Sequence, residues 1–127
     1  MKLLSSVVAG VLLVLVAGCG SQGKVKQTKH DVGELSLALD LYYTEHGAYP
    51  RGTTAEICRL LLGKTVGDQN QKQLSYIDAK GSELNAASEF VDPWGTPYRI
   101  FIGLPPRVYS CGPNKVDENG GGDDIAA

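Results

Sequence analysis

Hydrophobic positions follow two different patterns in the first third of the chain. Residues 3–17 form a nearly unbroken apolar run, interrupted only by two serines and one glycine. From residue 24 to residue 45, apolar residues instead recur at steps of three and four, the spacing of one helical face. This apolar face comprises Val32, Leu35, Ala38, Leu39 and Tyr42. The pattern predicts an amphipathic helix over residues 24–45, ended by Gly47 and Pro50.

Shorter elements follow the predicted long helix. Thr53 and Glu56 have the Thr-x-x-Glu spacing of a capping box, which predicts a short helix that Gly63 closes. Aromatic and β-branched residues predict two strands of a hairpin at residues 98–102 and 108–111. A hairpin needs a further strand or a helix packed against it for stability. We therefore expect an α+β fold in which the long helix covers a small antiparallel sheet.

Two features between these elements complete the fold prediction. Residues 74–77 give a candidate strand, and residues 89–91 lead into an Asp-Pro-Trp-Gly tetrad at residues 92–95. Proline at the second position of such a tetrad is typical of a β-turn. We expect Trp94 to anchor this turn in the hydrophobic core, because tryptophan buries a large apolar area.

The N-terminus indicates export from the cytoplasm. A basic start precedes the apolar run, and Val-Ala-Gly-Cys at residues 16–19 closes it, which is the order of a secretory signal. The closing tetrad resembles the lipobox of bacterial lipoproteins, in which the cysteine thiol receives a lipid. This resemblance implies a signal peptide over residues 1–18, a lipidated Cys19, a tether over residues 19–23 and a domain over residues 24–127. The alternative is an uncleaved membrane anchor. In both cases the domain is membrane-anchored in the cell envelope and faces the periplasm or the exterior.

Composition and charge argue against several classes of function. The chain is 43% hydrophobic, which is too apolar for a disordered protein. Its net charge is −2, and it lacks the basic cluster that a nucleic-acid binder needs. It carries only two histidines and no nucleotide-binding loop or nucleophile motif. We therefore expect a non-enzymatic protein with no small-molecule substrate and no nucleic-acid partner.

Two cysteines remain once Cys19 is assigned to the lipid. Cys58 and Cys111 have a single pairing in an oxidising compartment. A bridge that closes so long a loop would contribute about 4 kcal/mol to stability. The alternative is two buried free thiols, because cysteine is a common core residue. We favour the disulfide. The chain has no Cys-x-x-Cys pair, so neither a redox motif nor a zinc site is indicated.

The C-terminal segment, residues 112–127, combines glycines with acidic and amide side chains and has no apolar period. This composition is typical of a disordered acidic tail. It also has the chemistry of a calcium loop, because Ca²⁺ takes about six to eight hard oxygen ligands from a chain that curls tightly. The spacing and the flanking helices of an EF-hand are absent, so a calcium loop here is of a different kind.

Three segments resemble type II secretion pseudopilins, in the order that this family has them. Residues 39–50 resemble the end of the family's leucine-rich helix, where an aromatic residue and a glycine precede Tyr-Pro. Residues 92–99, Asp-Pro-Trp-Gly-Thr-Pro-Tyr-Arg, resemble its turn and the strand that follows. Residues 109–114 and 123–125 resemble its Ser-x-Gly-Pro-Asp and Asp-Asp-Ile ending. The chain thus resembles the major, G-type pseudopilins from about residue 24 to its C-terminus.

This resemblance implies a pilin-like fold, with the long helix packed on a three-stranded antiparallel sheet. It implies a structural role in type II secretion, through packing against copies of itself or other pseudopilin subunits. It also implies calcium in the C-terminal loop. Asn114 stands at the family's first aspartate ligand, and Asp123 and Asp124 match its later acidic pair. The main-chain ligands by position are the carbonyls of Cys111, Val116 and Gly121. Asn114 carries one negative charge fewer than the family pattern, and Asp117 or Asn119 is a candidate to compensate.

The N-terminus departs from the pseudopilin pattern. Pseudopilins carry a peptidase site after a glycine, a glutamate at the fifth mature position and a longer apolar segment that packs in the fibre. Here Gly10 precedes Val11, no acidic residue occurs before Asp31, and the apolar run ends at Cys19. The alternative function is therefore a lipid-anchored envelope lipoprotein with a pilin-like, calcium-binding head that does not polymerise.

Overall fold

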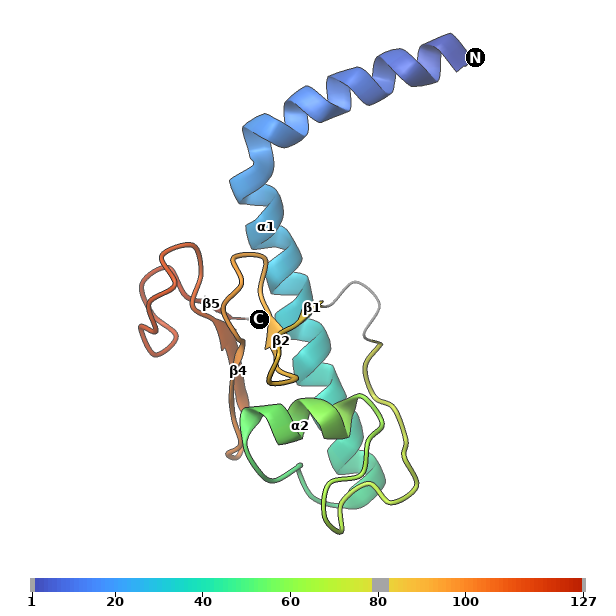
Figure 1. Ribbon diagram of the computed structural model, residues 1–127. Helices are drawn as coiled ribbons and strands as arrows, with labels where there is room; N and C mark the ends of the chain where they lie inside the picture. The colour runs from blue at the N-terminus through green and yellow to red at the C-terminus, as the bar shows by residue number, and fades with distance from the viewer. Residues whose placement is uncertain (1, 79–82, 127) are drawn as a thin grey trace.

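The computed structural model describes the backbone of residues 2–78 and 83–126, and the side chains of residues 22–78 and 84–126. Its helices and strands are α1 (Lys2–His46), α2 (Thr54–Leu61), β1 (Glu83–Leu84), β2 (Phe90–Val91), β3 (Arg99–Phe101), β4 (Arg107–Ser110) and β5 (Ile125–Ala126) (Figure 1). Strands β3, β4 and β5 form a three-stranded antiparallel sheet, and β1 pairs with β2 alone. The predicted α+β, pilin-like arrangement of one long helix with a small sheet is confirmed.

Helix α1 begins much earlier than the predicted helix and runs on through the apolar N-terminal segment. Figure 1 shows this first part projecting away from the sheets, while the second part runs alongside them. Cys19 and the segment 1–18 lie outside the residues whose side chains are described. Among the described residues, we find no helix with the length and apolar character that a membrane crossing requires.

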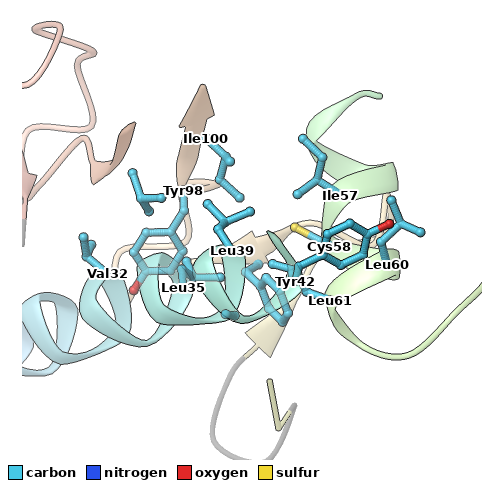
Figure 2. Packing of buried hydrophobic residues seen from close by; sticks show 13 residues of the cluster. Val32, Leu35, Leu39, Tyr42, Ile57, Cys58, Leu60, Leu61, Tyr98 and Ile100 are labelled. Atoms are coloured by element: carbon cyan, nitrogen blue, oxygen red, sulfur yellow. The ribbon is translucent and has the colours of Figure 1, made fainter. Parts of the chain in front are cut away.

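The hydrophobic core is built on the predicted face of α1. All five residues of that face are at most 3% exposed. They pack with one side of α2 and with the inward residues of the strands (Figure 2). The α2 and strand members of this core include Ile57, Cys58, Leu60, Leu61, Phe90, Tyr98, Ile100 and Val108. Each large apolar side chain buried in this way contributes about 1.5–3 kcal/mol to stability.

The ends of both helices follow the predicted local chemistry. Helix α1 stops at His46, and Gly47 takes a φ of +75°, the left-handed conformation of a helix C-cap. At the start of α2, the Glu56 amide donates to Oγ1 of Thr53 at 3.2 Å. In return, the Thr53 amide donates to Oε1 of Glu56 at 2.9 Å. This reciprocal capping box fixes the N-terminus of α2 as the sequence predicts.

Two strand predictions need correction. Residues 74–77 are not a strand. The amides of Tyr76 and Ile77 both donate to the Leu61 carbonyl, at 2.8 and 3.2 Å, so this segment closes the C-terminus of α2. Strand β5 was not predicted, because its two residues follow an acidic loop and are too few to show the alternation of apolar and polar side chains that is typical of a strand. It forms because the loop returns to β4, where Ile125 pairs with Ser110.

The Asp-Pro-Trp-Gly turn is anchored by its aspartate and not by Trp94. Trp94 is half-buried and is not part of the core cluster. Asp92 is only 2% exposed, and its Oδ1 accepts from the amides of Trp94 and Thr96, at 3.1 and 2.9 Å. Its Oδ2 accepts from the Ser110 hydroxyl at 2.6 Å, which ties the turn to β4. A buried carboxylate is tolerated here because both oxygens are hydrogen-bonded.

The favoured disulfide is not formed in the structure. Cys58 and Cys111 are both free and buried. Cys58 lies on α2 against the backbone of Phe90, and burial raises the pKa of its thiol to about 11. Cys111 follows β4, where the nearest charged groups include Asp117 and Asp124. The two thiols therefore have different surroundings, and each fills a position in the packed interior.

Candidate metal centre

The loop between β4 and β5, residues 111–124, contains the candidate site. Two glycines let its halves approach each other closely. Gly112 has a φ of +75°, and a Cβ on it would overlap the carbonyl oxygen of Asp123. Gly122 has a φ of +54°, and a Cβ there would overlap the carboxylate of Glu118. Gly112 thus requires glycine for conformation and for space, because the overlapping atoms belong to the backbone. Gly122 requires it mainly for conformation, because the Glu118 carboxylate ends a flexible side chain.

Three carboxylates converge in this loop. Glu118, Asp123 and Asp124 each place one oxygen within 4.8 Å of the other two. The family resemblance implied Asp123 and Asp124, and the structure brings their carboxylates together. It did not predict Glu118 as part of the site. Carboxylates held this close together repel each other unless a proton or a cation lies between them.

Asp124 has one satisfied oxygen and one unsatisfied oxygen. Its Oδ2 accepts from the amides of Glu118 and Gly120, both at 2.9 Å. Its Oδ1 is buried and has no hydrogen-bond partner in the described part of the chain. A buried carboxylate oxygen without a partner is costly, so this atom is a place where a water or a cation would be stabilising.

Asn114 organises the cluster through its amides. Its side-chain Nδ2 donates to Oε1 of Glu118 at 3.0 Å, and its backbone amide donates to Oδ2 of Asp123 at 3.2 Å. Its Oδ1 accepts from the Val116 amide at 2.8 Å, which forms a tight turn. Asn114 therefore contacts two of the three carboxylates, and its role as a calcium ligand stays a prediction.

Asp117 has a different role from the one considered in the sequence analysis. Its Oδ2 accepts from Nε and Nη2 of Arg99, both at 2.9 Å. Its Oδ1 accepts from the Tyr109 hydroxyl at 2.7 Å and from the Asn119 amide at 2.9 Å. The Tyr109 hydrogen bond contributes most to holding the pKa of Asp117 below its usual value. Asp117 thus joins the loop to β3 and β4 and is not part of the three-carboxylate cluster.

The main-chain positions predicted as ligands lie along the same loop. The Gly121 carbonyl accepts from the Asp124 amide at 2.9 Å. Val116 points its side chain outward, with 56% of it exposed. Cys111 is buried at the end of β4, directly before the loop turns. Calcium coordination by the carbonyls of these three residues stays a prediction.

The carboxylates influence each other's protonation. Burial and a hydrogen bond to Glu118 raise the pKa of Asp123 above its usual value. Hydrogen bonds from Asn114 and Asp123 lower the pKa of Glu118. The opposite directions arise because the two neighbouring carboxyl groups compete for the same proton. A divalent cation at this point would offset the repulsion among the three carboxylates.

Comparison with known families decides what kind of protein carries this loop. The family model described as Type II secretion system (T2SS), protein G, matches residues 16–127. The chain belongs to this family. The proteins of the type II secretion protein G family are structural, non-enzymatic pseudopilins of the cell envelope, and they assemble with other pseudopilin subunits. No curated protein and no solved structure matches the chain.

Proposed function

We propose that this protein G pseudopilin acts through subunit packing and that its C-terminal loop is stabilised by calcium. The observation that carries the calcium proposal is the unsatisfied, buried Oδ1 of Asp124 beside two other carboxylates. Calcium prefers hard oxygen ligands and forms stronger sites when several of them are charged. In this loop the carboxylates of Glu118 and Asp123 lie close to that of Asp124, which carries the oxygen without a partner.

The residues present fit a calcium ion. The side chains of Asn114, Asp123 and Asp124 would supply ligands, two of them charged. The remaining ligands would come from the carbonyls of Cys111, Val116 and Gly121. Bound calcium would neutralise the cluster and link the two halves of the loop. Because the loop joins β4 to β5, this link would also hold β5 in the sheet.

Exposed apolar side chains support the proposed packing between subunits. Leu37 and Leu41 are 53% and 45% exposed on the face of α1 turned away from the core. At the tip of the β3–β4 hairpin, Leu104 is 89% exposed, and Phe101 and Ile102 are also exposed. Apolar groups on two separate elements are suited to contacts with neighbouring subunits.

Photo-cross-linking in native membranes tests this role. A photoreactive residue placed at Leu37 or Leu104 is expected to trap a second copy or another pseudopilin. The matched control is Lys72, an exposed position in a polar loop, which should give no such product. Absence of subunit adducts from both apolar positions would contradict packing through these surfaces.

The second candidate function is a lipid-anchored envelope lipoprotein that does not polymerise. The lipobox-like sequence that ends at Cys19 favours it. The intact mass of the mature protein from its own membranes separates the two candidates. A mass that begins at a lipidated Cys19 would support the anchored protein. A mass that begins at Met1, or directly after Gly10, would show that the apolar segment is retained and would support assembly.

A further inference from the structure

We infer that Glu118 is the third charged ligand of the calcium site and replaces the negative charge that Asn114 does not supply. This inference rests on the proposed calcium-stabilised loop and names the residue that adapts it in this chain. Asp117 and Asn119 are the candidates for this role that the sequence suggests. The hydrogen bonds of the loop point to Glu118.

The spacing of the carboxylates is the first support. Calcium binds oxygen ligands at roughly 2.3–2.6 Å, so two ligands of one ion lie within roughly 5.2 Å of each other. The oxygens of Glu118, Asp123 and Asp124 meet this limit, since all lie within 4.8 Å of one another. Asp117 does not belong to this group, because Arg99 and Tyr109 engage both of its oxygens.

The second support is Oδ1 of Asp124, a buried oxygen without a hydrogen-bond partner in the described part of the chain. The Glu118 amide donates to Oδ2 of Asp124, so the same turn fixes Glu118 and orients the Asp124 carboxylate. That orientation leaves Oδ1 buried without a donor. A cation bound at the three-carboxylate cluster would give this oxygen a partner.

The pairing of Asn114 with Glu118 is the third support. Asn114 Nδ2 donates to Oε1 of Glu118, and the Asp123 amide donates to the same oxygen at 3.2 Å. An aspartate at 114 could not donate and would repel the Glu118 carboxylate. Gly122 leaves the space that this carboxylate fills. The side-chain amide of Asn114 and the carboxylate of Glu118 are therefore complementary. The negative charge that the family pattern has at position 114 is carried here by Glu118, four positions further along the loop.

Isothermal titration of calcium into the full chain, purified in detergent and freed of metal with a chelator, tests the inference. Glu118→Gln keeps the side-chain shape and is expected to weaken calcium binding about tenfold or more, because it removes one charged ligand. The matched control, Glu45→Gln, changes an exposed glutamate of α1 and should leave the affinity unchanged. Far-UV circular dichroism of each variant verifies that it is folded.

The double variant Asn114→Asp with Glu118→Gln tests the relocation of charge. It restores a carboxylate at 114 and a donor at 118, and is expected to recover most of the lost affinity. Calcium binding by the unsubstituted chain with no loss in Glu118→Gln would overturn the inference and leave the calcium loop standing. No recovery in the double variant would overturn the relocation. No calcium binding by the unsubstituted chain would overturn both the inference and the proposed loop.

Discussion

The hydrophobic core and the C-terminal loop are held together by different forces. In the core, the apolar face of α1 packs against α2 and the strands, and its stability comes from apolar burial, which needs no ion. In the loop, residues 113–123 are exposed, and carboxylates, amides and glycines with positive φ define the conformation. One small domain thus combines a core stabilised by apolar burial with a loop stabilised by polar contacts, and under the calcium proposal only the loop depends on a cation.

The largest expected loss of stability comes from truncating a buried side chain of the core. Leu39→Ala removes a side chain that is fully buried on α1, and should lower the free energy of unfolding by about 2–5 kcal/mol. Leu37→Ala is the matched control, because Leu37 is exposed on the same helix, and it should change stability by less than about 0.5 kcal/mol. Urea denaturation of the full chain in detergent measures both. Equal losses in the two variants would contradict the assignment of the core.

Removing calcium should have the next largest effect. At a free concentration one hundred times its Kd, calcium stabilises the native state by about 2.7 kcal/mol, so a chelator should lower the Tm. Asp123→Ala should melt at a lower temperature in calcium buffer, and its Tm should respond little to the chelator. Glu45→Ala, on exposed helix surface, should retain the full response. Differential scanning calorimetry measures the Tm of both variants with and without chelator. If the chelator lowers the Tm of Asp123→Ala as much as that of the unsubstituted chain, Asp123 is not a calcium ligand.

Alkaline pH should weaken the core through its buried thiol. Burial raises the pKa of Cys58 from an ordinary value of 9.0 to about 11, so the folded state favours the protonated thiol. The resulting stability is fully present below pH 9 and is lost as the pH rises from 9 to 11, by roughly 1–3 kcal/mol. Cys58→Ala should reduce the slope of stability against pH in this window. Denaturant titrations between pH 8 and 11 measure the slope, and an unchanged slope would assign the alkaline loss to other groups.

The smallest expected effect concerns the ion pair that joins the loop to the sheet. Arg99 and Asp117 are both partly exposed, at 46% and 32% of their side chains, so Arg99→Gln should cost less than about 1 kcal/mol. Calcium affinity should change by less than about threefold, because Asp117 is not in the carboxylate cluster. Calorimetric titration of this variant distinguishes the two roles. A loss of affinity as large as that expected for Glu118→Gln would place Asp117 in the site.

Much of the core could be predicted from the sequence, because its signals are local. The α1 face follows from a period of three and four residues, and the capping box of α2 is a contiguous motif. The anchor of the Asp-Pro-Trp-Gly turn was assigned wrongly, since side-chain size favoured Trp94. The partner that decides the anchor, Ser110 on β4, lies 18 positions from Asp92 and becomes visible only in the fold.

The candidate site was less accessible to sequence reasoning. Asp123 and Asp124 were found through a resemblance to a family pattern, and the structure brings them together. Glu118 was missed because its carboxylate comes close to the pair only in the folded loop, where it lies beside Gly122. Asn119 was considered as a compensating residue, but its side-chain oxygen lies 3.4 Å from the Arg107 guanidinium. The available signal was an asparagine four positions before a glutamate, with a glycine four positions after it.

Hydrogen exchange with and without calcium tests the central claim most directly. The account predicts that calcium slows the exchange of loop amides such as those of Glu118 and Gly120, which donate to Asp124. The comparison region is the polar loop at residues 65–73, which lies outside the carboxylate cluster and should exchange at the same rate in both conditions. Unchanged exchange in the C-terminal loop, or equal slowing in both loops, would contradict a local calcium site.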